Sequence, residues 1–293
     1  MFSNKDLRKL IIPLVIEQLL AVTIGMADTV MVSSCGEAAV SGISLVDSIN
    51  FLLITLFSSL ATGGAVIASQ YIGRGDHKSA SLAAKQLFYA SLALSAVLGI
   101  IAVFFRKPVL NMVFGSIEAD VMAHAQIYFL LSAISYPFLA VYNAGAALFR
   151  SMGDSRTTML ISILMNTINI VGNAILIYGF QMAAAGAATA SLVSRAVGAI
   201  IITVLLLNPH RIIFYDKLHK PEIHLSMLKS ILQIGVPNGL ENSIFQIGKI
   251  LVASIVSGFG TISITANAVA GNLASLQVIP GMALGMAMIT VVG

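Results

Sequence analysis

The chain has 293 residues, of which 58% are hydrophobic and only 10% are charged. In soluble domains about a quarter of the residues are charged, so this composition, with a mean hydropathy of +0.95, excludes a soluble protein and indicates an integral membrane protein. The net charge of +4 does not indicate nucleic acid as a partner. The basic residues lie in short connections between apolar stretches, where they orient a protein in the lipid bilayer.

Eight apolar segments follow one another along the chain, and each is long enough to cross a bilayer. We therefore predict an all-α polytopic membrane protein. In chain order the segments are Leu10–Ser33, Ser44–Ile72, Ala80–Phe105, Ala123–Leu148, Thr158–Tyr178, Ala183–Leu207, Met227–Ser257 and Ile262–Gly293.

Lysine and arginine gather on one side of these segments. Of the 16 basic residues, twelve lie in the N-terminal and alternate connections, two in the opposite connections and two inside segments. Because cytoplasmic loops are rich in Lys and Arg, we expect a multi-pass protein of the cell (inner) membrane with a cytoplasmic N-terminus. The twelve are Lys5, Arg8, Lys9, Arg74, Lys78, Lys85, Arg150, Arg156, Arg211, Lys217, Lys220 and Lys229. The other four are Arg106 and Lys107 on the far side, and Arg195 and Lys249 inside segments.

The longest connection, residues 209–226, is predicted to be a cytoplasmic linker between two lobes. Residues 1–208 would form a six-helix N-terminal lobe, and residues 227–293 the first two helices of a second, incomplete lobe. The spacing of His210, His219 and His224 indicates no metal site, and we expect them to be solvated.

Two stretches of the chain match at an offset of 224 residues. An even number of helices separates them, so both copies start on the same side, as in parallel repeats about an axis along the membrane normal. We expect the complete arrangement to have twelve helices, of which this chain would lack about four. The matches are Pro13 with Pro237, Glu17 with Glu241, Ser33 with Ser257 and Gly36 with Gly260.

Two acids interrupt the first segment, "IPLVIEQLLAVTIGMADTVMV". Glu17 and Asp28 are about three helical turns apart and share one face. A charged side chain at the bilayer centre costs about 2.5–3.5 kcal/mol, so we predict that Asp28 faces a wet cavity and exchanges a proton or cation. For Glu17, a structural role near the cytoplasmic surface is the alternative.

Amides and charges form stripes on two later segments. Asn166, Asn169 and Asn173 share one helix face in the fifth segment, where they would bind a ligand or join helices. The seventh segment carries a broader stripe, in which Glu241 and Lys249 would compensate each other through amides or line a cavity. Its members are Asn238, Glu241, Asn242, Gln246 and Lys249. For Arg195 we favour a structural role.

Several stretches of the sequence resemble the multidrug and toxic compound extrusion (MATE) family, and together the resemblance covers essentially the whole chain. The most specific part is "ALFRSMGDSRTTMLISILMNTINIVGNAILIYG", residues 147–179, similar to the family's fourth and fifth helices. "MADTVMV", "ASQYIGRGD", "AAAGAATASLVSR" and "IGVPNGLE" resemble its first helix, the basic turn after the second, its sixth helix and the entry of its seventh.

The resemblance implies a cation-coupled antiporter and no enzyme. Inflow of H+ or Na+ would drive export of amphipathic, often cationic organic compounds by alternating access, without a cofactor and with a monomer as the working unit. The family's ion site joins an Asp of the first helix, an Asn and an Asp of the fifth and a Thr of the sixth. The matching residues here are Asp28, Asn169, Asn173 and Ser191.

Asn173 replaces the second Asp, so the expected site has one negative charge fewer and would bind Na+ less strongly, while proton coupling through Asp28 remains open. The expected substrate cavity comprises Glu17, Gln18, Asn166, Glu241, Asn242, Gln246 and Lys249. A lipid-linked oligosaccharide flippase of the same superfamily is the alternative function. A membrane prenyltransferase is disfavoured, because it would need paired acidic clusters for Mg²⁺ and no two acids are adjacent.

Overall fold

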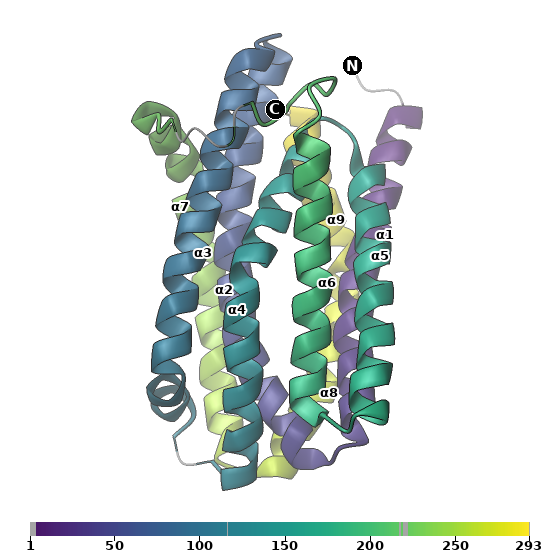
Figure 1. The fold of residues 1–293 in the computed structure, drawn as a ribbon, viewed down its shortest axis with the longest axis vertical. Coiled ribbons are helices and arrows are strands. Elements are labelled where there is room, and N and C mark those ends of the chain that lie inside the picture. The colour runs from purple at the N-terminus through teal and green to yellow at the C-terminus, as the bar shows by residue number, and fades with distance from the viewer. Residues whose placement is uncertain (1–3, 116, 217, 219–221, 293) are drawn as a thin grey trace.

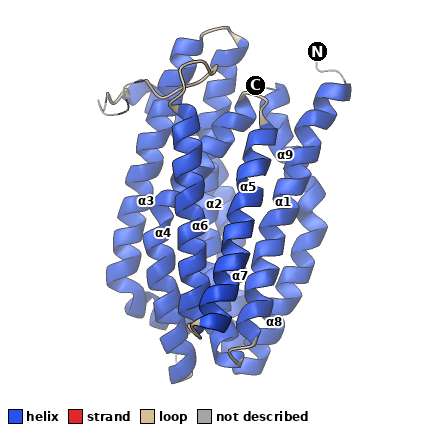
Figure 2. Ribbon diagram, turned by 45° about the vertical axis from the view of Figure 1, so that its right-hand side comes forward, coloured by secondary structure: helices blue, strands red, loops and turns tan. Residues whose placement is uncertain are grey.

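The computed structural model describes residues 4–115, 117–216, 218 and 222–292. These residues form helices and loops without strands (Figure 2), which confirms the predicted all-α polytopic fold. Within them, seven helices are long and apolar enough to cross a membrane. The helices are α1 Asn4–Ser33, α2 Glu37–Gly73, α3 His77–Phe114, α4 Ala119–Ser151, α5 Ser155–Asn173, α6 Ala183–Leu206, α7 Leu225–Ser257, α8 Thr261–Ser275 and α9 Ile279–Val292, with a π-helix at Ala174–Gly179 and a 3-10 turn at Leu276–Val278.

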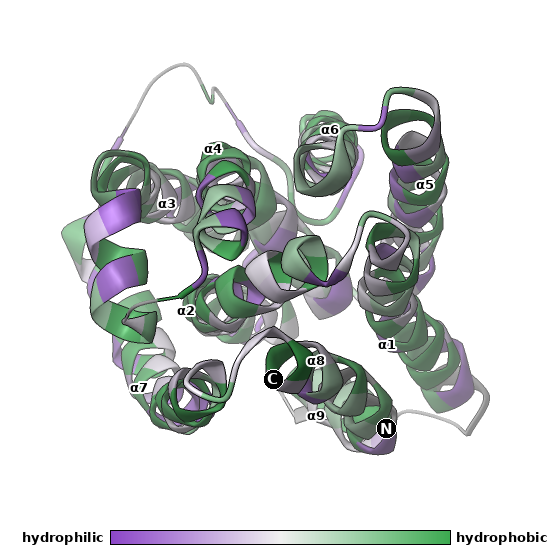
Figure 3. Cartoon of the chain, turned by 90° about the horizontal axis from the view of Figure 1, so that it is seen from below, coloured by the Kyte–Doolittle hydropathy of each residue, from purple (hydrophilic) through white to green (hydrophobic). Residues whose placement is uncertain are grey.

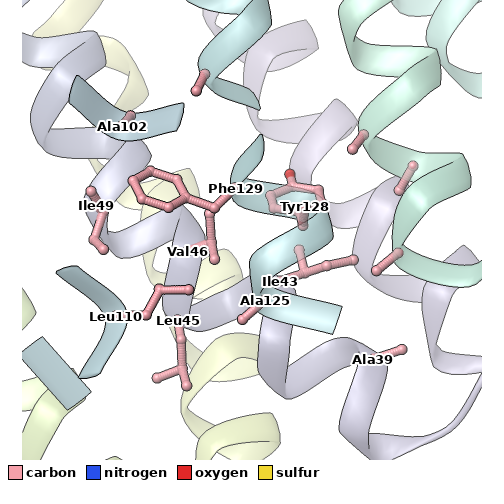
Figure 4. Packing of buried hydrophobic residues seen from close by; sticks show 14 of the residues in the cluster. Ala39, Ile43, Leu45, Val46, Ile49, Ala102, Leu110, Ala125, Tyr128 and Phe129 are labelled. Carbon is pink, nitrogen blue, oxygen red and sulfur yellow. The ribbon is translucent and has the colours of Figure 1, made fainter. Parts of the chain in front are cut away.

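The helices run side by side along the long axis, and both ends of the chain lie at the same end of the bundle (Figure 1). Viewed along the helices, α2 lies in the middle, with α4 and α6 on one side and α1, α8 and α9 on another (Figure 3). The apolar core forms where α2 meets α3 and α4. Leu45, Val46, Leu110 and Phe129 pack together there (Figure 4).

Glycines allow α2 to approach its neighbours closely. A Cβ added at Gly42 would lie 2.8 Å from the carbonyl oxygen of Val121 in α4, and one at Gly63 would lie 2.8 Å from the backbone nitrogen of Gly235 in α7. Any side chain would collide with backbone at these two points. Without a hydrophobic driving force between helices in lipid, such close packing is what holds them together.

The third segment extends beyond its predicted end. We predicted that it stops at Phe105, but α3 continues to Phe114 after a kink at Phe105, whose φ of −105° and ψ of 17° are not helical. Pro108 has no N–H to donate, and its ring clashes with the carbonyl four residues earlier, which explains the kink. Arg106 and Lys107 therefore lie within a helix and not in a loop.

The eighth segment is broken, where we predicted one continuous span. The 3-10 turn at Leu276–Val278 separates α8 from α9 directly before Pro280. Proline fits the first turn of a helix, whereas in the interior it removes a backbone hydrogen bond and can kink or break the helix. At the matching position of the first copy, 224 residues earlier, α2 has Leu56, and that helix runs unbroken.

The connection between α6 and α7 is packed against α3, although we expected a solvated linker. The buried side chain of Gln86 donates to the carbonyl of Glu222 at 2.6 Å and accepts from the backbone N–H of His224 at 3.1 Å. Tyr215 is also buried. His210 and His224 are exposed as expected, whereas His219 lies outside the described residues.

The two copies of the repeat have the same local geometry. α1 ends at Ser33 and α7 at Ser257, and a glycine with positive φ precedes the next helix in both, Gly36 at 100° and Gly260 at 90°. The hydroxyls of Ser41 and Thr265, which are equivalent at the offset of 224, lie 3.2 Å apart. Equivalent residues touch only near an axis that relates the copies, so that axis passes between α2 and α8.

Candidate functional site

Four polar side chains from three helices form a continuous hydrogen-bonded chain, and they are the four that the family resemblance pointed to. The Asn173 amide donates to Asp28 Oδ1 and also, at 3.3 Å, to Asn169 Oδ1. The Asn169 amide in turn donates to Ser191 Oγ at 3.0 Å. All four side chains are buried: Asp28 is 8% exposed and Asn173 is 0% exposed. We call this set the amide chain.

Local structure places these side chains on facing surfaces. Asn169 and Asn173 are four residues apart, so they share one face of α5. Gly172 allows α6 to come close, since a Cβ there would lie 3.0 Å from the Cβ of Ala190. The π-helix begins directly after Asn173, and π-turns within helices are frequent at functional sites.

The amide chain has an unused acceptor next to its acid. Asn173 Oδ1 is buried and has no hydrogen-bond partner among the described residues. Buried polar atoms nearly always have a hydrogen-bond partner, so this exception indicates either a ligand or a second orientation of the Asn173 amide. Asp28 Oδ1 and Asn169 Oδ1 both accept from the Asn173 amide nitrogen, so Asn173 Oδ1 is the oxygen of this residue that remains for a ligand or a donor.

Asn166 does not join the amide chain, although it lies on the same stripe. Its amide nitrogen donates to the carbonyl of Ser162 in its own helix at 2.8 Å, and its Oδ1 is another buried acceptor without a partner in the described part of the chain.

Glu17 is held in an ion pair and has no hydrogen bond to the amide chain among the described residues. Its Oε1 accepts from Arg150 at 3.0 Å and its Oε2 from the Thr158 hydroxyl at 2.8 Å. The carboxylate thus joins α1, α4 and α5. This geometry supports the structural alternative over a place in the substrate cavity.

The other expected cavity residues lie away from the amide chain. Gln18 Nε2 is 3.5 Å from the sulfur of Met286 in α9. Glu241, Asn242 and Lys249 are exposed on α7, and Gln246 is partly exposed. Lys249 Nζ lies 5.0 Å from the centre of the Phe245 ring. It forms no ion pair with Glu241, which is eight residues away along the helix. The ion pairs of the described residues are Glu17–Arg150 and Asp154–Arg211.

A second polar group in the interior was not expected from the sequence. Asp47 in α2 accepts from Tyr128 Oη at 3.0 Å and from Asn50 Nδ2 at 3.2 Å. Tyr136 Oη donates to Asn50 Oδ1 at 2.8 Å. Nearby, Arg195 Nη1 donates to Ser135 Oγ at 2.7 Å. The only signal in the sequence was a lone acid within an apolar run, "SLVDSINFL".

A bundle of membrane-crossing helices with ionisable groups and amides buried between them has the architecture of a membrane transporter, since polar groups at such positions mark ion and solute pathways. In the described residues no group of three or more potential metal ligands occurs.

Comparison with known proteins agrees with this class. The profile of the MatE family matches residues 13–175. A probable multidrug resistance protein NorM of Thermotoga maritima is 29% identical over 299 residues, 99% of this chain and 62% of its own length. The uncharacterized transporter YisQ of Bacillus subtilis is 29% identical over 285 residues, 93% of this chain and 60% of its own length.

Solved structures share the fold. An outward-facing multidrug resistance MATE family transporter superposes with a TM-score of 0.86 at 23% identity, over 97% of this chain and 63% of its own. The MATE multidrug transporter DinF-BH gives a TM-score of 0.92 at 22% identity, over 99% of this chain and 65% of its own.

The chain belongs to the MatE family, a family of transporters and not of enzymes. It spans about three fifths of the length of the curated relatives that it matches, 62% and 60% for the two named above.

Proposed function

We propose that the protein is part of a cation-coupled antiporter that exports amphipathic, often cationic organic compounds by alternating access. The observation that carries this proposal is the amide chain, in which a buried carboxylate, Asp28, has a neutral amide as its hydrogen-bond partner among the described residues. Burying a charge without a partner is costly, so the site favours uptake of a proton or a small cation. Family membership supports export of organic compounds.

The side chain of Asn173 is suited to follow the protonation of Asp28. An ionised carboxylate only accepts hydrogen bonds, as Asp28 does from Asn173 Nδ2. A protonated carboxyl group also donates, and the unpartnered Asn173 Oδ1 would accept from it if the amide turns over. Because Asn173 is also hydrogen-bonded to Asn169, a rotation of its amide would change the hydrogen bond to Asn169 and, through it, the one to Ser191 in α6.

The proposed location is the cell (inner) membrane with the N-terminus in the cytoplasm. The support is the distribution of Lys and Arg along the sequence, since twelve basic residues fall in or near the N-terminal and alternate connections and two fall near the opposite ones. The chain ends in Figure 1 lie at the end of the bundle to which most of those connections belong.

Replacing Asp28 with Asn tests the proposal. The protein is reconstituted in vesicles, and movement of a fluorescent organic cation is followed under an imposed pH or Na+ gradient. We expect Asp28→Asn to reduce gradient-driven movement to the level of protein-free vesicles, because the exchangeable charge is gone while the shape and hydrogen-bonding of the side chain remain. Asp120→Asn, at an exposed position of α4, is the matched control. Undiminished gradient-driven movement in Asp28→Asn would refute the proposal.

A further inference from the structure

An open cavity of about 920 Å³ lies between α1 and the start of α5, at the end of the bundle where the chain begins. The two helices contact each other (Figures 1 and 3). None of the residues that line the cavity belongs to the amide chain. Ligand pockets have volumes of about 300–1,000 Å³, so the cavity has room for a group much larger than an ion.

Three cations line the mouth of this cavity, Arg8 and Lys9 from α1 and Arg156 from α5. All three side chains are exposed, and none of them forms an ion pair within the described residues. They are among the first residues of their membrane-crossing helices, since the crossing stretches begin at Leu7 and Ser155. Basic residues at this position lie at the level of the lipid headgroups.

The carboxylate in the cavity wall already has partners. Asp154 Oδ1 accepts from the backbone N–H of Thr157 at 3.1 Å, and its Oδ2 accepts from the Thr157 hydroxyl at 2.7 Å and from Arg211 at 3.2 Å. Lys5 and Asp6, in the preceding turn of α1, carry opposite charges and leave the balance as it is. Three cations against one carboxylate make the cavity positive, so it repels an organic cation and attracts an anion.

Further along the two helices the wall of the cavity is apolar. Ile12, Pro13 and Ile16 follow the two cations of α1, and Met159 follows the cation of α5 by one turn. At about 1.5 Å per residue, Ile16 lies roughly 12 Å deeper than Arg8. A soluble anion would gain nothing from such a wall, whereas an amphiphile would bury its hydrocarbon against it.

We propose that this cavity binds one anionic phospholipid, with its phosphate between Arg8 and Arg156 and an acyl chain along the apolar wall. Arginine binds phosphate oxygens through two parallel hydrogen bonds, and basic pockets between membrane-crossing helices hold anionic lipid headgroups. This inference does not rest on the proposed function, because it uses no residue of the amide chain.

The test measures binding to the purified protein in detergent by native mass spectrometry. Phosphatidylglycerol, phosphatidylcholine and water-soluble glycerol 3-phosphate are titrated in turn. For the wild type we expect one phosphatidylglycerol, bound about tenfold more tightly than phosphatidylcholine, and no glycerol 3-phosphate over the same concentrations. We expect Arg8→Gln/Arg156→Gln to weaken binding of phosphatidylglycerol about 30-fold, equivalent to about 2 kcal/mol for the two basic residues.

Arg74→Gln/Lys78→Gln is the matched control. It removes the same charge at exposed positions around the turn between α2 and α3, outside the cavity, and should bind phosphatidylglycerol as the wild type does. A second measurement needs no variant. A phosphatidylglycerol with a photoreactive group on its acyl chain is expected to crosslink to the wild-type peptide that contains Ile12 and Ile16.

Three results would overturn the lipid site. Equal weakening in the two double variants would show that general surface charge holds the lipid. Glycerol 3-phosphate bound as tightly as phosphatidylglycerol would show a site for soluble anions. Crosslinks confined to other parts of the chain would place the lipid elsewhere. Asp28→Asn is expected to bind phosphatidylglycerol as the wild type does, so its transport result bears on the proposed function alone.

Discussion

At the scale of single residues, Asn173 sets the charge of the proposed ion site. It stands where the resembling family has an acid, and it offers Asp28 a neutral donor. A site with one carboxylate attracts Na+ less than a site with two, because affinity for hard cations rises with the number of charged ligands. A proton needs only the one carboxylate.

Restoring the second acid is therefore expected to change the ion preference. We predict that Asn173→Asp raises the affinity for Na+ by about tenfold, equivalent to about 1.4 kcal/mol, measured by sodium binding to the purified protein. Asn166→Asp is the control, because it adds the same charge to the same helix outside the amide chain. An equal gain in both variants would show that position 173 has no special role.

The site was predictable from the sequence only as far as local spacing and family resemblance reach. The stripe of Asn169 and Asn173 follows from helical periodicity, and the resemblance added Asp28 and Ser191. The partners of Glu17 and Asp47 were not predictable, because Arg150 and Tyr128 are 133 and 81 residues away from them in the chain. In the sequence, Glu17 and Asp47 look alike, because each is a single acidic residue within an apolar run. In the structure Glu17 forms an ion pair, whereas Asp47 accepts hydrogen bonds from neutral side chains.

At the scale of elements, the Glu17–Arg150 ion pair joins helices at the end of the bundle where the chain begins. Glu17 connects α1 to α4 through Arg150 and to α5 through Thr158. The carbonyl of Arg150 accepts from Thr290 of α9 at 2.8 Å. One residue of α4 thus contacts both the first helix and the last described helix.

Removing the charge of Glu17 is expected to destabilise the protein. Glu17→Gln leaves the largely buried guanidinium of Arg150 without its counter-charge, and breaking a buried pair from one side costs about 3 kcal/mol. Glu241→Gln is the matched control, since it changes the equivalent residue of the repeat at an exposed site and should stay within about 0.5 kcal/mol. Thermal unfolding in detergent measures both. Similar unfolding temperatures for the two variants would contradict a stabilising role of the pair.

The positions of the membrane-crossing helices were predictable, but some of their ends and their interruptions were not. Apolar length located the seven helices of the described residues that are long enough to cross, because the bilayer sets that length, but it also predicted an eighth continuous span, which is broken. The kink at Phe105 and the break before Pro280 depend on which of several prolines cannot be accommodated. Pro13, Pro137 and Pro237 lie inside continuous helices. The π-helix after Asn173 had no signal in the sequence at all.

At the scale of the whole molecule, the repeat organises the contacts between the first helices and the last. The contact between Ser41 and Thr265 lies at the axis that relates the copies. The copies differ in their chemistry: Glu17 is buried in an ion pair, whereas its counterpart Glu241 is exposed. The amide chain lies wholly in the helices that precede the linker, so the proposed ion site uses no residue of the helices that follow it.

The central claim is that the amide chain lines a passage that water enters. The measurement uses Ser191→Cys, a nearly isosteric change at the end of the amide chain, in a Cys35→Ala background, which removes the single native cysteine. A membrane-impermeant thiol reagent is applied to either side of vesicles containing the protein, with and without a cation gradient. We predict that position 191 reacts, and that the gradient changes the side from which it reacts. No reaction from either side under any gradient would contradict the account.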